Sequence, residues 1–132
     1  MKVLFVCEGN KMRSPMAEAF YNSLTNTTDA ASAGCDPYPM GFAFPDVVAA
    51  MHEKDIELEH YSQLVTQEMV DTADVVVAFP TPLMPDFVTQ DKKTRLWDIS
   101  DPYYQPKDGQ DHIRHARDKI EVLVKDLVKE LA

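Results

Sequence analysis

Short apolar or β-prone runs alternate along the chain with segments that have helical spacing or helix-capping residues. The runs are typical of β-strands, and they cover residues 2–6, 30–34, 74–79 and 94–99. The intervening segments are typical of helices, and they cover residues 14–24, 45–56, 66–73 and 113–131. The pattern therefore predicts strands and helices that follow one another along the sequence.

This alternation predicts an α/β fold with three layers, in which a four-stranded parallel sheet carries helices on both faces. At 132 residues the chain is long enough to bury one core and too short for two ordinary ones, so we expect a single domain over residues 1–132. Ligands of such folds bind at the carboxyl ends of the strands. The segment after the first predicted strand lies at such an end.

Composition and charge exclude several classes of partner. The chain is 45% hydrophobic and 27% charged, and it has no apolar run near the roughly 20 residues that a membrane-spanning helix needs. The net charge of -9 argues against nucleic acid or an anionic membrane, because binding to either needs clustered Lys and Arg. The apolar start, MKVLFVCEG, is too short for a secretory signal, so we expect a cytoplasmic protein.

Cysteine and histidine usage points to a reactive thiol instead of a metal site. Cys7 and Cys35 are too few for a disulfide scaffold and lack the paired spacing of a zinc site. His112 and His115 are three positions apart on the last predicted helix, but the sequence offers no third ligand beside them. We therefore expect a reduced protein with no metal and no cofactor.

The stretch VCEGNKMRSPMAE, residues 6–18, joins the first predicted strand to the first predicted helix. We expect Ser14 to cap this helix and Pro15 to take its first position. A loop that enters a helix in this way points several backbone N–H groups, and the positive end of the helix dipole, at one spot. The loop is thus predicted to bind an anion.

The side chains of this loop suit catalysis by a thiolate on a phosphate group. Gly9 lets the backbone approach an anion closely, and Asn10 tolerates a left-handed conformation. Arg13 can bind two phosphate oxygens with its planar fork. The same positive field favours the thiolate of Cys7, and the hydroxyl of Ser14 can donate to that sulfur.

The spacing C-x-x-x-x-x-R-S near the start, with DPYY at 101–104, resembles the low-molecular-weight protein tyrosine phosphatases and the related thioredoxin-type arsenate reductases. The resemblance covers essentially the whole chain and includes SAG at 32–34 and His60. It implies a four-stranded parallel sheet between helices, in agreement with the pattern above. It also implies that Cys7 takes the phosphoryl group, that Arg13 binds its oxygens, and that Asp101 is the general acid.

Further site residues follow from the same resemblance. The phosphate is expected to be bound by the loop residues Glu8, Gly9, Asn10, Lys11, Met12, Arg13 and Ser14. A hydrogen-bonded group that supports the loop is expected from Asn10, Ser14, Ser32 and His60. The substrate mouth is expected to include Tyr38, Tyr103 and Tyr104. The expected partners are a phosphorylated protein, in particular one with phosphotyrosine, or a small phosphomonoester, together with inorganic phosphate or a similar oxyanion.

Three loop residues depart from the family pattern. Glu8 adds an acid to an anion site and is expected to weaken phosphate binding. Met12 replaces a second cysteine, so a protective pair with Cys7 cannot form inside the loop. Lys11 stands at a position that is apolar in the tyrosine phosphatases and Thr in the phosphoarginine phosphatases of the family. Its charge should repel the guanidinium of phosphoarginine, which disfavours that substrate without establishing phosphotyrosine.

Other interpretations of the sequence stay open. Asp98 is a rival to Asp101 as the acid. An arsenate reductase that uses a small thiol as co-reductant is one alternative, although the segment AFPTPLMPDF lacks the further cysteines of the thioredoxin-linked type and only Cys35 could resolve an oxidised Cys7. A phosphate-binding relative with little turnover is another, since Glu8 and Lys11 are unusual in the loop.

Overall fold

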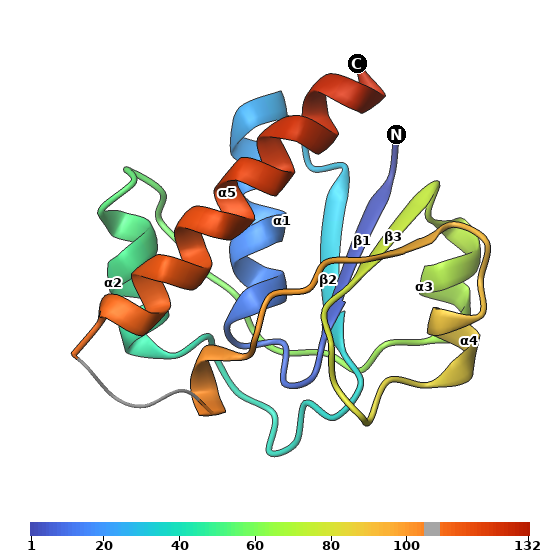
Figure 1. Cartoon of the computed structure of the whole chain (residues 1–132), viewed down its shortest axis with the longest axis horizontal. Helices are drawn as coiled ribbons and strands as arrows, with labels where there is room; N and C mark the ends of the chain where they lie inside the picture. The colour runs from blue at the N-terminus through green and yellow to red at the C-terminus, as the bar shows by residue number, and fades with distance from the viewer. Residues whose placement is uncertain (105–108) are drawn as a thin grey trace.

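Four parallel strands form one sheet in the computed structural model, which describes residues 1–104 and 109–132 (Figure 1). Their order across the sheet is β2-β1-β3-β4. The strands are β1 (Val3–Cys7), β2 (Ala30–Gly34), β3 (Val75–Ala78) and β4 (Thr94–Leu96). The predicted four-stranded parallel sheet is therefore confirmed. Residues 105–108 of the predicted loop before the last helix lie outside the described residues.

Helices cover both faces of this sheet, which confirms the three layers (Figure 1). One face carries α1 (Arg13–Thr25), α2 (Pro45–His52) and α5 (Asp111–Leu131). The other face carries α3 (Gln67–Thr72) and α4 (Asp86–Thr89). A short 3-10 helix, η1 (Pro102–Tyr104), lies beyond the carboxyl ends of the strands. The sequence pattern did not predict α4, which is too short to show a helical period.

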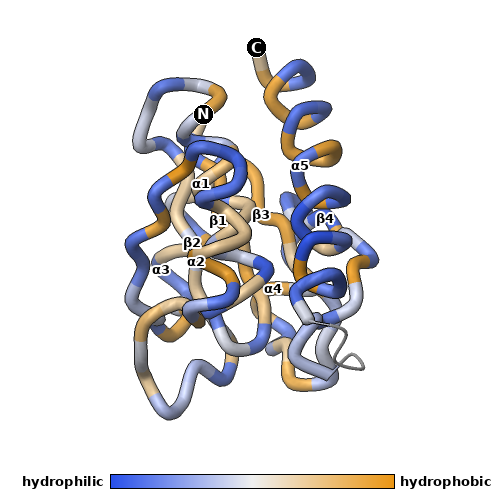
Figure 2. Tube along the Cα trace, turned by 90° about the vertical axis from the view of Figure 1, so that its left-hand side faces the viewer, coloured by the Kyte–Doolittle hydropathy of each residue, from blue (hydrophilic) through white to orange (hydrophobic). Residues whose placement is uncertain are grey.

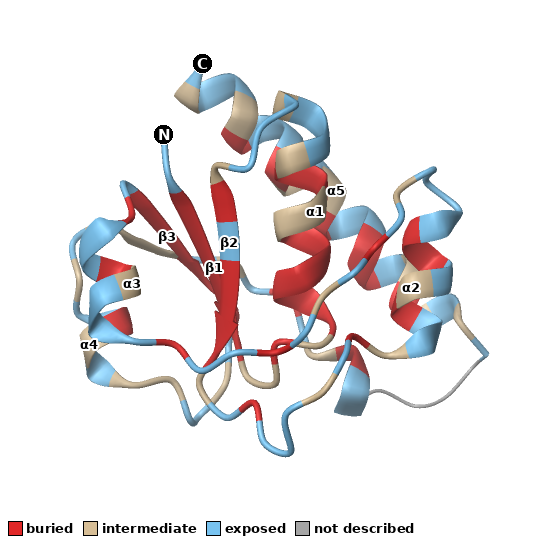
Figure 3. Cartoon of the chain, turned by 180° about the vertical axis from the view of Figure 1, so that it is seen from behind, coloured by how far each residue is buried: buried red, intermediate tan, exposed pale blue. Residues whose placement is uncertain are grey.

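The two faces of β1 supply two separate cores because successive strand residues point to opposite sides. Val3, Phe5 and Cys7 pack with α1, α2 and α5, whereas Leu4 and Val6 pack with α3 and α4. All five are buried, and Figure 3 shows β1 and β3 buried between helices whose outer sides are exposed. Burying a side chain as large as Phe5 contributes about 1.5–3 kcal/mol to folding.

The long α5 has the amphipathic pattern that the sequence predicts. Along its turns hydrophobic and hydrophilic residues alternate, as Figure 2 shows. The buried positions are Ile113, Ala116, Arg117, Ile120, Val124 and Leu127. Arg117 is the exception in this apolar stripe, so its charge needs partners. No helix in the described part of the chain is long and apolar enough to span a membrane.

Two predicted helix boundaries were wrong. The first helix begins at Arg13 after Met12, so Ser14 lies in its first turn and is not the cap, and Pro15 takes the third position of the helix instead of the first. The reason is that the Ser14 hydroxyl bonds Cys7 and Asn10 in the preceding loop. The second helix ends at His52, four residues early, and Asp55 follows with a left-handed φ of 60°.

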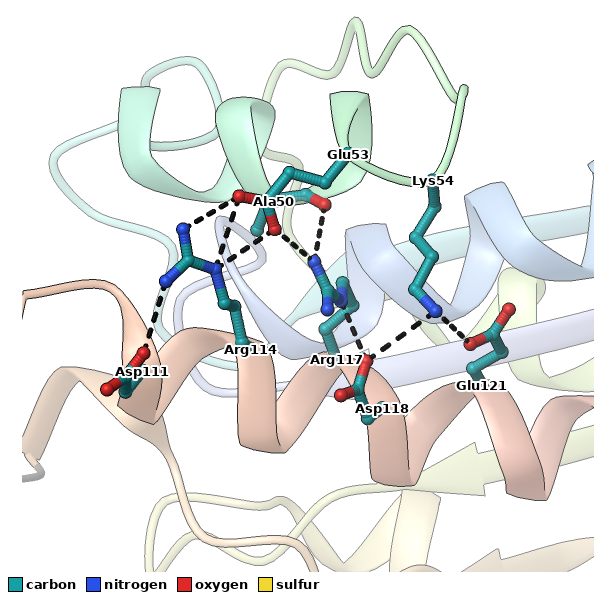
Figure 4. A network of polar contacts seen from close by, with 8 residues as sticks. All are labelled: Ala50, Glu53, Lys54, Asp111, Arg114, Arg117, Asp118 and Glu121. Atoms are coloured by element: carbon teal, nitrogen blue, oxygen red, sulfur yellow. Dashed lines mark hydrogen bonds and ion pairs between the residues drawn. The ribbon is translucent and has the colours of Figure 1, made fainter.

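An ion-pair network fastens α2 to α5 (Figure 4). Buried Arg117 donates to the carbonyl oxygen of Ala50 at 2.9 Å and to Oε1 of Glu53 at 2.6 Å. Arg114 donates to the same Glu53 carboxylate at 2.7 Å, from a half-exposed position. Together the two arginines hold the pKa of Glu53 down at about 2, with the bond from Arg114 as the larger cause. Glu53 is therefore charged at any pH near neutrality.

We expect Arg117→Ala to destabilise the protein more than Arg114→Ala. The first change leaves the buried carbonyl of Ala50 without its donor, which costs roughly 1–3 kcal/mol, whereas the second removes only a solvent-screened pair. Urea unfolding of both variants measures the difference. Equal losses in unfolding free energy would contradict this account of the network.

Candidate active site

The site lies at the carboxyl edge of the sheet, where β1 runs into α1 through residues 8–12. The register aligns Cys7 with Gly34 and Val6 with Ala78, so the ends of three neighbouring strands meet there. A pocket of about 440 Å³ opens at this edge. It is lined by Cys7, Glu8, Gly9, Lys11, Met12, Arg13, Asp36, Tyr38, Pro39, Phe44, Asp101, Tyr103 and Tyr104.

Hydrogen-bond donors surround the sulfur of Cys7 at the base of the pocket. Ser14 Oγ lies 2.9 Å from Sγ, and the backbone N–H of Asn10 donates to Sγ across 3.2 Å. Ser14 and Asn10 are fully buried, so water competes little for these bonds. The Cys7 sulfur thus accepts from the loop backbone and also lines the pocket, where a ligand can reach it.

Asn10 is the centre of the network that supports the loop. Its φ of 56° is left-handed, as its residue type allowed. Its Nδ2 donates to Ser14 Oγ at 2.8 Å and to Ser32 Oγ at 3.0 Å. Its Oδ1 accepts from His60 Nε2 at 2.8 Å and from the N–H of Gln63 at 3.0 Å. The structure thus brings together all four residues named for this network.

Two members of this network were missed in the sequence. Gln63 contributes a backbone N–H, which its residue type does not reveal. Glu18 accepts from Ser32 Oγ at 2.6 Å, and burial raises the pKa of its carboxyl group. Burial also lowers the pKa of His60, which favours the neutral ring. Glu18 follows the loop on α1, and its contacts with Ser32 and with His60, whose Nδ1 lies 3.9 Å from Glu18 Oε1, distinguish it from an ordinary helix residue.

Arg13 is 1% exposed, so its guanidinium must be paired. One nitrogen donates to the carbonyl oxygens of Pro80, at 3.1 Å, and Ile99, at 2.9 Å. The other lies 3.3 Å from Oδ2 of Asp101. The guanidinium also lies over the ring of Phe79, 5.6 Å from its centre. These contacts fix the orientation of the Arg13 guanidinium plane at the edge of the pocket.

Of the two rival acids, Asp101 is the one at the pocket. It is half-buried, its Oδ2 faces Arg13, and its Oδ1 accepts from the N–H of Tyr103 at 3.0 Å. Asp98 is exposed and is not among the described residues that line the pocket. The placement favours Asp101 as the group that meets a leaving oxygen.

The carboxylate of Glu8 is engaged by two hydroxyl groups. Thr81 Oγ1 donates to Oε1 at 2.7 Å, and the Tyr104 hydroxyl donates to Oε2 at 2.6 Å. The bond from Tyr104 lowers the pKa of Glu8, and the same bond raises the pKa of Tyr104 to about 12. Glu8 is therefore ionised near neutrality, with part of its charge offset by these donors.

The rim of the pocket is aromatic and carries one ammonium group. Lys11 donates to the carbonyl oxygen of Pro39, and its Nζ lies 5.9 Å from the centre of the Phe44 ring. Tyr38 and Tyr103 are exposed and line the same pocket. Phe44 and Thr81 were not predicted at the site, because nothing in their local sequence shows that the fold brings them to this loop.

Two glycines border the loop with different roles. A Cβ on Gly34 would lie 2.7 Å from the carbonyl oxygen of Glu8, so only glycine lets β2 run this close to the loop. A Cβ on Gly9 would meet no atom within 4 Å, so protein packing does not require this glycine. The close approach of backbone that this structure requires is therefore at Gly34, and the approach of an anion to Gly9 stays a prediction.

Cys35 lies beside Cys7, whose carbonyl oxygen accepts from the Cys35 backbone N–H at 3.0 Å, but the two side chains are on opposite faces of the sheet. It packs on the α3 and α4 face of the sheet, whereas Cys7 belongs to the opposite core. Burial raises the pKa of the Cys35 thiol to about 11, so it stays protonated near neutrality. Within residues 1–104 and 109–132, no three His, Cys, Asp or Glu side chains are grouped as metal ligands.

Comparison with known proteins identifies the family. The family described as low molecular weight phosphotyrosine protein phosphatase matches residues 2–132. The chain belongs to this family. The protein-arginine-phosphatase of Bacillus subtilis (strain 168) is 34% identical over an alignment of 148 positions, gaps included, which covers 99% of this chain and 97% of the relative. The arsenate reductase 1 of Staphylococcus epidermidis is 30% identical over an alignment of 108 positions, gaps included, which covers 76% of each chain.

Solved structures support the same assignment. A mutant of the YwlE arginine phosphatase with a phosphorylated active-site serine has a TM-score of 0.83 and 31% identity, and the match covers 99% of this chain and 95% of that one. The resemblance inferred from the sequence, the α/β fold and the assignment to a phosphatase family that is related to arsenate reductases are therefore confirmed.

Proposed function

We propose that this member of the phosphatase family hydrolyses phosphomonoesters on proteins through a phosphoryl group bound to Cys7. One observation carries the proposal: the Cys7 sulfur accepts from the loop, in a pocket that also contains Arg13 and Asp101. A nucleophile, a binder of phosphate oxygens and an acid thus share one cavity. This combination is what covalent phosphoryl transfer requires.

In the first step the Cys7 thiolate attacks phosphorus, and the bond from phosphorus to the ester oxygen breaks. Arg13 and the N–H groups of the loop stabilise the charge on the phosphoryl oxygens. Without a ligand, Asp101 Oδ2 lies 3.3 Å from the Arg13 guanidinium. The arriving phosphate therefore competes with Asp101 for this guanidinium. Asp101, once protonated and released, gives its proton to the leaving oxygen.

In the second step a water molecule attacks the phosphorus. Asp101, now a carboxylate, takes a proton from that water, and the sulfur-phosphorus bond breaks. Inorganic phosphate leaves, and the Cys7 thiolate is restored with Ser14 donating to it. No oxidant, reductant or metal takes part, which separates this reaction from arsenate reduction, where Cys7 would need a second thiol.

The substrate we propose is phosphotyrosine in a protein, in preference to phosphoarginine. Tyr38, Phe44 and Tyr103 give the pocket an aromatic rim that suits a phenyl ring. Lys11 adds a positive charge to the same rim, and a guanidinium would be repelled by it. The cytoplasm is the compartment we propose, because Cys7 must stay reduced to act.

The first test is turnover of p-nitrophenyl phosphate by the reduced protein between about pH 5 and 7, a range in which a carboxylic acid and a thiolate can act together. We expect Cys7→Ser to abolish turnover, because a serine hydroxyl at this position is not ionised. Cys35→Ser is the matched control and should retain the wild-type rate. An active Cys7→Ser variant would refute covalent catalysis by this residue.

The second test compares peptides that carry phosphotyrosine or phosphoarginine. We expect the wild type to favour phosphotyrosine in kcat/KM, and Lys11→Thr to shift the ratio toward phosphoarginine by roughly fivefold to tenfold, which corresponds to about 1–1.4 kcal/mol for one partly screened charge. Lys92→Thr, at an exposed lysine outside the pocket lining, is the control. A wild type that prefers phosphoarginine would overturn the choice of substrate.

A further inference from the structure

Glu8 joins three segments that are far apart in the sequence. It follows β1, while Thr81 follows β3 and Tyr104 ends η1. Both of its carboxylate oxygens are used, one by the hydroxyl of Thr81 and one by the hydroxyl of Tyr104. A hydroxyl donor on each carboxylate oxygen indicates that Glu8 has a structural role in the loop.

The segment that Tyr104 ends also carries Asp101. The N–H of Tyr104 donates to the backbone oxygen of Asp101 at 3.2 Å, and the N–H of Tyr103 donates to its Oδ1 at 3.0 Å. These two bonds close a tight turn over residues 101–104. A contact that restrains the end of this turn therefore restrains the carboxyl group at its start.

The turn is attached on both sides of the pocket. On the α2 side, the ring of Tyr103 stacks on Phe44, with 6.1 Å between ring centres and 25° between planes. On the other side, the ring of Tyr104 is 66% exposed, so burial holds it only weakly. Its hydroxyl bond to the charged Glu8 is the polar contact on that side, and bonds to an ionised acceptor are stronger than neutral ones.

We propose that Glu8 is a positioning residue, which anchors the turn over residues 101–104 to the phosphate loop and so holds Asp101 in place for proton transfer. The inference rests on the proposed function, and it reverses the expected effect of this acid. The sequence predicted that the Glu8 carboxylate weakens phosphate binding. In this proposal it instead holds the general acid, Asp101, at the correct position relative to the Cys7 sulfur.

This role predicts a specific kinetic signature. A misplaced general acid slows the release of a poor leaving group much more than that of a good one, because only the poor one needs the proton. Phenyl phosphate has a poor leaving group, and p-nitrophenyl phosphate has a good one. The ratio of their kcat/KM values therefore reports the position of Asp101, because kcat/KM reflects the first step, in which the leaving group departs, while the second step is the same for both substrates. General damage to the loop lowers both values together.

The experiment measures this ratio in Glu8→Ala and Tyr104→Phe. We expect kcat/KM for phenyl phosphate to fall at least about fivefold more than kcat/KM for p-nitrophenyl phosphate in both, a part of the roughly 10²–10⁴-fold that a general acid supplies. Asp101→Asn is the reference for complete loss of the acid. The matched controls are Glu68→Ala and Tyr61→Phe, at exposed residues away from the pocket.

The double variant Glu8→Ala/Tyr104→Phe should lose little more than Glu8→Ala alone, because Glu8→Ala already removes the acceptor of the Tyr104 hydroxyl. Two outcomes would overturn the proposal. One is an unchanged ratio in Glu8→Ala. The other is a rise in kcat/KM for both substrates together with tighter inhibition by inorganic phosphate, which would show that Glu8 only repels the anion.

Amide hydrogen exchange tests the anchor without any turnover. We expect the N–H groups of Tyr103 and Tyr104 to exchange faster in Glu8→Ala and in Tyr104→Phe than in the two controls, while the amides of β1 stay unchanged. Faster exchange in a protein that shows no phosphatase activity would support the anchor and refute the proposed function. Unchanged exchange would refute the anchor whether or not the protein is active.

Discussion

The left-handed backbone of buried Asn10 is the constraint on which the site depends. This conformation turns the chain so that the N–H of Asn10 and the hydroxyl of Ser14 both reach the Cys7 sulfur. A non-glycine residue in this region costs energy and persists only when its surroundings hold it. The side-chain bonds to Ser32 and His60, which come from distant segments, supply that support. The rigidity of the loop is thus provided by the whole fold.

The parallel sheet brings these supports to one place. Because the carboxyl ends of β1 and β2 are in register, Ser32 comes beside the loop and Gly34 lets the loop backbone pass. Arg13 extends the arrangement to the other side, where the carbonyl oxygens that follow β3 and β4 orient its guanidinium. Glu8 connects the loop to the turn that carries Asp101. Nucleophile, anion binder and acid are therefore positioned by one edge of one sheet.

The sequence could predict the parts of this site that lie within one segment. The order of strand, loop and helix, and the residue types from Cys7 to Ser14, carry their own physical reasons. The structure places most of these residues in the pocket lining, while Asn10 and Ser14 are buried and support the loop. The helix start was wrong because the Ser14 hydroxyl bonds the loop in preference to capping the helix. Thr81, Phe44 and the backbone of Gln63 reach the site only through tertiary structure, and no local pattern marks them.

The central claim is that the Cys7 sulfur carries the phosphoryl group during turnover. The most direct measurement is an acid quench of the reduced wild-type protein during hydrolysis of p-nitrophenyl phosphate, followed by peptide mass spectrometry. The account predicts one phosphoryl group on the peptide that contains Cys7, and none in a Cys7→Ala variant, which has no side-chain nucleophile at this position. Turnover that leaves the Cys7 peptide unmodified, with the phosphoryl group on another residue, would contradict it.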